Sequence, residues 1–313
     1  MRLIHLDDRE GVRPLPNVDS PDQAAASALG GVESRCQWAP GDLASFDTAL
    51  VSMTKYQHRD REDSWMSAIP MAKRAGLRTW LFQEAEADWF NCRPDEEQLA
   101  FVRNVRQADG MLCHTEDAAA FYRALLGIPC VAVPTLMPLS RLPKRREQEL
   151  IPRRLVILGT PDERARGWWA LAAWKAAGIE HNWRLDVITR DGADNGARAR
   201  PVLDALGLVG RTYGYLPLSQ YADLFNGATL IVTMLRARAA QRDHILAYHY
   251  QVPIVDTWTI NVDRFSAVVE AIRGHAQMVF NTREYRAGMQ AHDWDPERSP
   301  LVYRVALTEG GLL

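Results

Sequence analysis

The sequence predicts an α/β protein with two domains, each built on a mainly parallel sheet, and three observations support this class. First, 313 residues exceed what one core comfortably holds and fit two domains of about 150 residues each. Second, strand-like runs alternate with helix-like runs along the chain, which is typical of βαβ units. Third, each strand-like run is almost continuously apolar, as expected for strands covered on both sheet faces.

The first half contains six strand-like runs, with helix-like segments between most of them. The helix-like segments with the clearest ends cover residues 64–76, 95–109 and 116–127. Thr115 can cap the start of the last segment, and Gly127 can end it. The expected strands are 2–7, 33–38, 48–53, 78–83, 110–115 and 130–135. We therefore expect a first domain over residues 1–140.

The pattern restarts after a basic linker, residues 141–153, and predicts a second domain over residues 154–280. Helix-like segments there cover 166–178, 197–207, 218–227, 239–250 and 265–275. The expected strands are 154–159, 184–189, 211–215, 229–234 and 253–257. A tail over 281–313 contains one more helix-like segment, 283–292, and packing against the first domain is one option for it. Two such sheets joined by a short linker predict a central cleft facing the carboxyl ends of their strands.

Charge and apolar content limit the classes of protein. The net charge is −2, but the first half is acidic and the second half basic. The basic run 141–154 reads either as a solvated linker or as a rim that receives phosphates. No apolar segment approaches the roughly 20 residues that cross a bilayer, and the N-terminus lacks an apolar signal region, so we expect a cytoplasmic protein. The four cysteines lie far apart and favour reduced packing residues over a metal site.

A phosphate-binding layout follows the first strand of the second domain. That strand ends in Gly159-Thr160, and Arg166-Gly167 opens the next helix. Backbone N–H groups at this helix start and the Arg166 guanidinium can share a diphosphate. A plain strand-to-helix turn with a surface arginine is the alternative. The segment matches neither the GxGxxG nor the Walker A motif, so dinucleotide and ATP chemistry are not indicated.

The order of pieces in the second domain resembles the retaining nucleotide-sugar glycosyltransferases of the GT-B fold, which have two Rossmann-like domains. The matching pieces are VILGT, Arg166-Gly167, LDVITRDG, VGRTYGYL, LSQYADLFNGATLIVTM and QVPIVDT, within residues 110–257. The resemblance implies a nucleoside diphosphate sugar as donor, UDP-linked, with no cofactor and no metal. The donor and phosphate residues it suggests are Gly159, Thr160, Arg166, Gly167, Arg190, Arg238 and Arg242.

The chain departs from that family at two glutamates that bind donor sugar and ribose. Counting back from Pro253, these positions hold Arg238 and Leu246, neither of them acidic. The preceding loop carries Arg236 and Arg238, and Arg242 follows. Either arginines hold the donor through its phosphates, or the domain has lost its donor and binds another anion.

The first domain resembles glycosyltransferase-like proteins encoded by bacteriophages. The shared features are Gln83-Glu84, Trp89-Phe90, EEQLAFV at 96–102, LCHTEDAA at 112–119 and the run Pro134 to Met137. This resemblance implies a hydroxymethylated pyrimidine in phage DNA as the favoured acceptor, and hence double-stranded DNA as a partner in the host cytoplasm. A glycan or lipid-linked acceptor fits the fold equally well.

Catalytic candidates stand at strand ends of the first domain. Glu84 or Glu86 can act as the general base that deprotonates an acceptor hydroxyl. His114 can orient a sugar hydroxyl or take a proton, or it can simply bond its own loop. Aromatic side chains suited to stacking on the acceptor are Trp89, Phe90 and Tyr56. We therefore expect a metal-independent glycosyltransferase, with a non-catalytic, anion-binding GT-B relic as the alternative.

Overall fold

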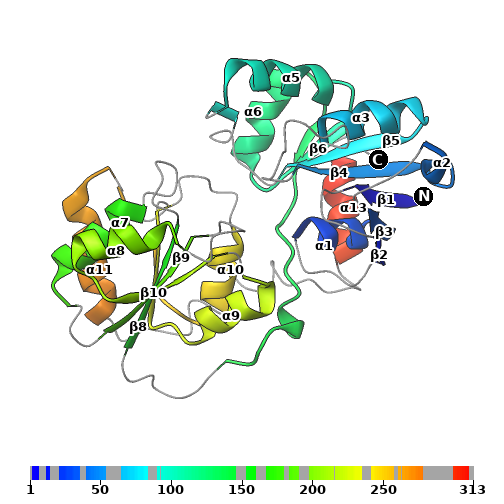
Figure 1. The fold of residues 1–313 in the computed structure, drawn as a ribbon. Coiled ribbons are helices and arrows are strands. Elements are labelled where there is room, and N and C mark those ends of the chain that lie inside the picture. Colours follow the sequence, from blue (N-terminus) through cyan, green and yellow to red (C-terminus); the bar gives the residue numbers. More distant parts are fainter. Residues whose placement is uncertain are drawn as a thin grey trace. The chain divides into compact units, whose positions relative to one another are not determined.

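The structure is a computed structural model, and the described residues form two compact units (Figure 1). The first unit comprises residues 1–139, 237–241 and 291–313, and the second comprises 140–236 and 242–290. Described residues are 2–6, 12–14, 21–35, 40–53, 65–83, 90–91, 93–145, 153–159, 167–179, 183–189, 197–214, 216–234, 241–256, 260–261, 263–277 and 299–309.

The first unit contains a 7-stranded sheet in the order β2-β3-β1-β4-β5-β6-β7. All six expected strands are present, although one begins two residues earlier than expected, at Gly31. The antiparallel edge strand β2 was not expected; it pairs with β3, while the other pairings are parallel. The strands are β1 (Leu3–Leu6), β2 (Val12–Pro14), β3 (Gly31–Arg35), β4 (Thr48–Met53), β5 (Arg78–Gln83), β6 (Gly110–Cys113) and β7 (Cys130–Ala132).

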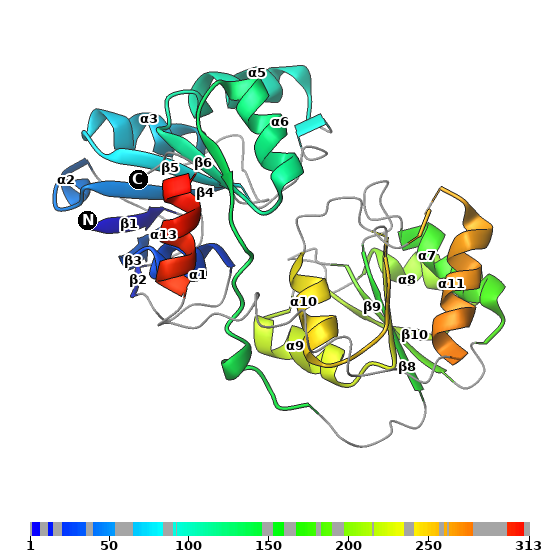
Figure 2. The ribbon, with the colours of Figure 1, turned by 180° about the vertical axis from the view of Figure 1, so that it is seen from behind.

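Helices cover both faces of this sheet. One face packs against α3 (Trp65–Arg74), α5 (Asp95–Val105) and α6 (Glu116–Leu126). The expected cap of α6 is confirmed: Thr115 Oγ1 accepts from the Ala118 N–H at 3.2 Å, and Gly127 ends the helix at φ +69°. The opposite face packs against α1 (Pro21–Ala28) and α13 (Ser299–Glu309), which lie together in Figure 2. The short elements α2 (Pro40–Leu43) and the 3₁₀ turn η1 (Leu139–Arg141) complete the described helices before the second sheet.

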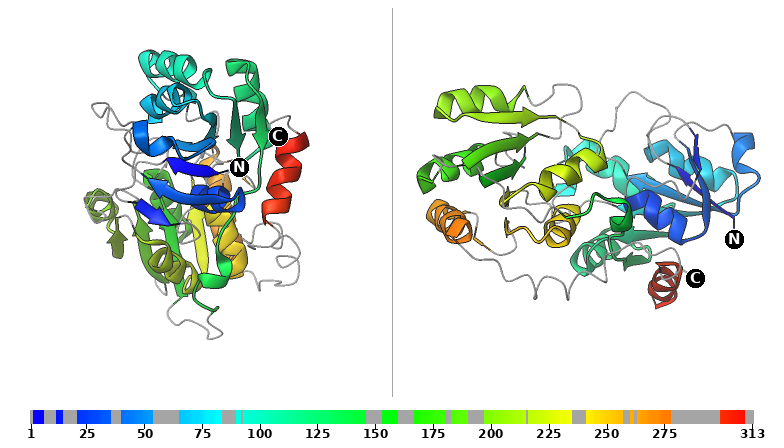
Figure 3. Two further views of the ribbon diagram at one scale, coloured as in Figure 1. Left: turned by 90° about the vertical axis from the view of Figure 1, so that its right-hand side faces the viewer. Right: turned by 90° about the horizontal axis from the view of Figure 1, so that it is seen from below.

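The helix α13 belongs to the core of the first unit although it lies at the far end of the chain. Tyr303 and Leu307 are fully buried in a core cluster with residues of α1 and of the sheet, and α13 lies against α1 and β7. The Tyr303 hydroxyl donates to the Pro134 carbonyl at 2.9 Å. Figure 3 shows this helix, in red, against the first unit from two further directions. The expected helix 283–292 lies outside the described residues.

The second unit contains a 5-stranded, fully parallel sheet in the order β10-β9-β8-β11-β12. Its strands are β8 (Arg153–Leu158), β9 (Trp183–Ile188), β10 (Gly210–Tyr213), β11 (Leu230–Thr233) and β12 (Ile254–Val255), close to the expected ranges. Its helices are α7 (Gly167–Ala177), α8 (Ala199–Leu206), α9 (Leu218–Asn226), α10 (Gln241–His249) and α11 (Phe265–Gln277). In Figure 1 the group α7, α8 and α11 lies on one side of the sheet, and the pair α9 and α10 lies on the other.

Cys113 and Cys130 are buried free thiols, as the packing interpretation predicts. Of the described helices, none has the length and apolar character to cross a membrane.

Candidate functional site

Each sheet has a point where its strand order reverses, and open α/β sheets bind ligands outside the carboxyl ends of the strands at such points. In the first unit the chain passes from β1 to β3 on one side and then returns to β4 on the other. In the second unit the chain passes from β8 through β9 to β10 and then returns to β11 beside β8. A phosphate site in the second unit is therefore expected at the segments that follow β8 and β11.

Gly159 and Gly167 border the segment that follows β8. Gly159 has φ +142°, which side chains with a Cβ rarely adopt, and its N–H donates to the Ile188 carbonyl at 2.9 Å. Gly167 is the buried first residue of α7, so free backbone N–H groups of this helix begin at the carboxyl edge of the sheet. The other expected phosphate residues Thr160, Arg166, Arg190 and Arg238 lie outside the described residues.

Arg242 stands at the start of α10, the helix after β11. Its guanidinium lies 4.7 Å from the centroid of the Tyr221 ring, in cation–π contact. The Tyr221 hydroxyl donates to Asp243 Oδ1 at 2.6 Å, and Asp243 is buried. The Arg242 Nε lies 3.9 Å from that same oxygen, which is too far for a hydrogen bond. The stacked ring and nearby carboxylate thus hold the guanidinium in place beside the reversal point.

A buried histidine–carboxylate hydrogen bond lies one strand further along the same edge. His244 Nε2 lies 2.6 Å from Asp256 Oδ2, and Asp256 follows the end of β12. The pair ties α10 to the carboxyl end of β12. The sequence interpretation missed Tyr221, Asp243, His244 and Asp256. An acidic residue directly after an apolar strand was an available signal for Asp256, whereas no local pattern identifies the pairing partners.

Leu246 and Gln251 show how α10 differs from the glycosyltransferase family that the sequence resembles. Leu246, at the second glutamate position, is fully buried in this unit. Gln251 stands where the family motif has glycine, and it adopts φ +55°, a positive value that no other described non-glycine residue shows. The backbone geometry that the family glycine allows is thus retained, while the carboxylate is replaced by core packing.

In the first unit, His114 follows β6 at the carboxyl edge of the sheet. Its Nδ1 is hydrogen-bonded to Thr135 Oγ1 at 2.8 Å, and its ring packs edge-on against Phe82. Burial lowers the pKa of His114 to about 4, against a smaller opposing effect of the Asp22 carboxylate. The imidazole is therefore neutral near pH 7, and one of its nitrogens is already engaged with Thr135.

The remaining acceptor-side candidates fall in two groups. Glu84, Glu86, Trp89 and Tyr56 lie outside the described residues. Phe90 is described and is 7% exposed, with its ring 5.5 Å from that of Phe101 and 5.9 Å from that of Phe121. Its ring therefore packs in the core of the first unit, which leaves little surface for stacking on an acceptor.

A buried polar network lies beneath the reversal point of the first sheet. His5 on β1 is hydrogen-bonded through Nδ1 to Ser34 on β3 at 2.8 Å and through Nε2 to Ser52 on β4 at 2.6 Å. The Asp22 carboxylate lies 3.5 Å from the same Nε2. All four residues are buried, so the network joins three strands and α1 near the carboxyl edge. The sequence interpretation did not identify it.

Within the described ranges, no group of three or more His, Cys, Asp or Glu is arranged to hold a metal ion. The described side chains at the edge of the second sheet instead offer glycine backbone, a helix start and the Arg242 guanidinium, a set that suits an anionic group.

Comparison with known proteins finds no matching family model and no matching curated protein. Solved structures do match. Sucrose-phosphate synthase from Thermosynechococcus elongatus aligns over 99% of this chain and 100% of its own, at 12% identity and TM-score 0.67. HepE of Anabaena, in complex with UDP and glucose, aligns over 99% and 100%, at 8% identity and TM-score 0.68. Trehalose-6-phosphate synthase OtsA aligns over 85% and 72%, at 9% identity and TM-score 0.59.

These three structures are GT-B glycosyltransferases, and the likeness extends over both units of the chain. The first two cover nearly the whole length on each side, so neither unit is an addition to the shared architecture. At identities this low the likeness establishes the fold. The chain therefore has the GT-B fold of two α/β domains with parallel sheets.

Proposed function

We propose that this protein is a glycosyltransferase that moves a sugar from a UDP-linked donor to an acceptor hydroxyl. The observation that carries the proposal is the reversal point of the second sheet, where Gly159 after β8 and Arg242 after β11 border the same edge. The N-terminus of α7 together with the Arg242 guanidinium suits a diphosphate. The HepE complex with UDP and glucose, which has the same fold, supports a UDP-linked donor.

The donor side would work by stabilising the leaving group. As the acceptor oxygen bonds to the anomeric carbon, the bond from that carbon to the diphosphate breaks and negative charge grows on the phosphate oxygens. Arg242 and the start of α7 would stabilise this charge without a metal ion. Thr160, Arg166, Arg190 and Arg238 complete the proposed donor set on the strength of their sequence positions.

The acceptor side would supply a general base. Glu84 or Glu86, directly after β5, would take the proton of the acceptor hydroxyl. His114 is neutral and bonded to Thr135, so it would orient a hydroxyl through hydrogen bonding. Trp89 and Tyr56 are the proposed stacking residues. The choice of a hydroxymethylated pyrimidine in phage DNA as acceptor rests on the sequence resemblance alone.

The donor proposal is tested by a thermal-shift screen with UDP, UDP-glucose and GDP-mannose, followed by assays of donor hydrolysis. We expect UDP and a UDP-sugar to raise the melting temperature. If no nucleotide stabilises the protein and no donor is hydrolysed, the enzyme proposal is wrong. Once a donor is identified, hydroxymethylated DNA, ordinary DNA, glycans and lipid-linked sugars serve as acceptors. Mass spectrometry of the nucleosides decides the DNA question, because an unchanged nucleoside profile excludes DNA.

A second candidate function is a non-catalytic module that binds anions through the same edge. The buried Leu246 favours it, because a side chain within the core cannot replace the carboxylate that holds a donor in the family. Binding of UDP without hydrolysis or transfer of any UDP-sugar would support this second function over the first.

A further inference from the structure

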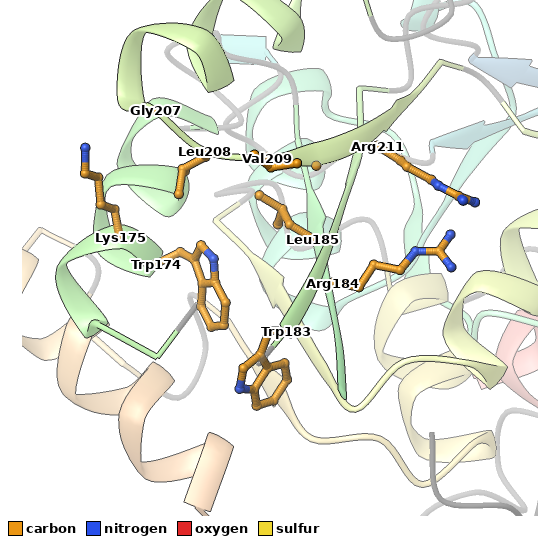
Figure 4. A pocket seen from close by; sticks show the side chains of 10 residues that line it. Trp174, Lys175, Trp183, Arg184, Leu185, Gly207, Leu208, Val209 and Arg211 are labelled. Carbon is orange, nitrogen blue, oxygen red and sulfur yellow. The ribbon is translucent and has the colours of Figure 1, made fainter. Parts of the chain in front are cut away.

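A pocket of about 560 Å³ opens at the opposite edge of the second sheet from Gly159 (Figure 4). It lies where β9 and β10 begin and where α8 ends, so it is formed by the amino ends of these strands. Parallel strands place their two ends on opposite edges of a sheet. The pocket is therefore separate from the proposed donor edge, and its size falls in the range of small-ligand sites.

One end of the pocket is cationic. Arg211 is the register partner of Asp186, and Arg184 precedes Asp186 by two residues, so the three side chains share one sheet face. The guanidinium groups of Arg184 and Arg211 extend in the same direction in Figure 4. Within the described part of the chain, Arg211 has no acidic partner. Two guanidinium groups on adjacent strands are thus available to one anion.

The buried carboxylate of Asp186 lies between the polar side chains at the cationic end of the pocket. It accepts hydrogen bonds from the Arg154 Nε and, at 3.1 Å, from the Tyr213 hydroxyl. The Arg184 Nε lies 3.5 Å from the same carboxylate. The Arg184 Nε is thus within ion-pair distance of Asp186 without a hydrogen bond to it, and its terminal nitrogens extend outward in Figure 4. Three arginines, Arg154, Arg184 and Arg211, surround the single carboxylate of Asp186, so this end of the pocket has an excess of positive charge. Arg154 is the last residue of the basic run 141–154.

The other end of the pocket is apolar and aromatic. Leu185 and Leu208 are buried beneath it, while Val209 is 94% exposed at its mouth. The indoles of Trp174 and Trp183 pack edge-on at 5.5 Å between centroids. Figure 4 shows these tryptophans on the opposite side of Leu185 from the two arginines. Because successive strand side chains point to opposite faces, the apolar end and the cationic end lie on the two faces of the sheet, where the edge strand β10 begins. Such an arrangement suits a ligand that reaches around this edge, with an anionic group at one end and an apolar or aromatic body at the other.

We propose that this pocket binds a ligand of that class: a phosphate, sulfate or carboxylate joined to an aromatic or aliphatic body. Arg184 and Arg211 would bind the anionic group, and Leu208, Val209 and Trp183 would contact the body. A soluble aryl phosphate and the headgroup region of an anionic lipid share this chemistry. The opposing explanation is that the arginines only keep the edge strand β10 from pairing with other chains.

The test measures binding of 1-naphthyl phosphate, 1-naphthol and inorganic phosphate to the full-length protein by calorimetry. We expect 1-naphthyl phosphate to bind at least about tenfold more tightly than 1-naphthol or inorganic phosphate, because only 1-naphthyl phosphate contacts both ends of the pocket. The double substitution R184Q/R211Q should lower its affinity by about tenfold or more. The matched control Arg200→Gln, an exposed arginine on α8, should leave it within about twofold.

Two further measurements keep the test decisive. Val209→Glu changes an exposed side chain, so the protein should fold normally, and the added carboxylate should weaken 1-naphthyl phosphate binding. UDP binding should be the same in all these variants, because the donor edge is distant. The proposal is wrong if the protein binds phosphate and 1-naphthyl phosphate with equal affinity. It is also wrong if R184Q/R211Q and Val209→Glu both bind 1-naphthyl phosphate as the wild type does. Either result would favour arginines that only keep β10 from pairing with other chains.

The source of the ligand is decided by vesicles of phosphatidylcholine with and without phosphatidylglycerol. Binding to anionic vesicles that R184Q/R211Q abolishes and 1-naphthyl phosphate displaces identifies a lipid headgroup. Binding of 1-naphthyl phosphate without vesicle binding identifies a soluble ligand.

Discussion

Replacement of Arg242 by glutamine tests whether the guanidinium at the start of α10 binds the donor diphosphate. A hydrogen bond to a charged group contributes about 1.5–3 kcal/mol, and the Arg242 side chain is 29% exposed, so the lower end applies. A loss of about 1.5–2 kcal/mol weakens UDP binding by about 10- to 30-fold. Because uridine lacks the diphosphate, its affinity should change by less than about twofold.

The same substitution has a separate effect on stability. It removes the cation–π contact with Tyr221, worth about 0.5–1 kcal/mol at a partly exposed site. The melting temperature should therefore fall by about 1–4 °C, too little to unfold the protein at assay temperature. Arg242→Lys keeps the positive charge but loses the planar guanidinium. Its affinity for UDP should therefore lie between that of the wild type and that of Arg242→Gln.

Calorimetric titration of UDP and uridine into the wild type, Arg242→Gln and Arg242→Lys gives the required comparison. Arg200→Gln serves as the control for loss of one positive charge from the second unit. If Arg242→Gln binds UDP as tightly as the wild type does, Arg242 does not bind the donor diphosphate. If uridine and UDP lose affinity equally, the loss reflects damage to the fold and the assigned role is wrong.

Three further predictions concern stability. Gln251→Gly should raise the free energy of unfolding by about 0.5–1 kcal/mol, because Gln251 has φ +55° and glycine adopts this geometry without strain. Denaturant titration measures this change. A decrease in the free energy of unfolding would show that contacts of the Gln251 side chain outweigh the backbone strain. The folded-state pKa of His114, about 4, lies below the unfolded value near 6.5, so the unfolded chain takes up the proton first. The stability from the neutral imidazole is complete above about pH 6.5 and is lost as pH falls toward 4, by on the order of 3 kcal/mol; His114→Gln should flatten the pH dependence of unfolding in that window, and identical wild-type and variant profiles would contradict this. Leu307→Ala should lower the stability of the first unit by about 2–5 kcal/mol, because Leu307 is fully buried, whereas exposed Val305→Ala should change it by less than about 0.5 kcal/mol; equal effects in chemical denaturation would show that α13 does not stabilise the core.

Local sequence patterns were enough to identify the described strands of both units apart from β2. Most of them are short apolar runs with a clear end, and Gly127 and Gly207 close their helices at positive φ. The edge strand β2 escaped notice because its three residues, Val12 to Pro14, include a proline and no alternation. The helix α13 itself was not predicted, although packing of the tail against the first domain was one option. Tyr303 and Leu307 are buried by residues far away in the sequence, so no local pattern marks them.

The candidate site was predictable only in part. Gly159 and Gly167 were proposed from local signals, a glycine after a strand and a glycine at a helix start, whereas Arg242 was suggested by the family resemblance; their role in donor binding stays a prediction. The pairs Tyr221–Asp243 and His244–Asp256 were missed because their members lie on separate elements. Phe90 looked like a stacking residue beside Trp89, but burial against Phe101 and Phe121 is decided by the packing of α5 and α6.

Local amino-acid patterns were enough to predict the alternation of strands and helices, the two α/β domains and the resemblance to GT-B glycosyltransferases. They did not predict which strand ends lie together. The strand order places the segments after β8 and β11 at one edge of the second sheet, while Arg184 and Arg211 stand at the other edge. The physical reason is that periodicity and capping act within one segment, whereas strand order depends on which apolar faces are buried together, and that is set by contacts between distant parts of the chain.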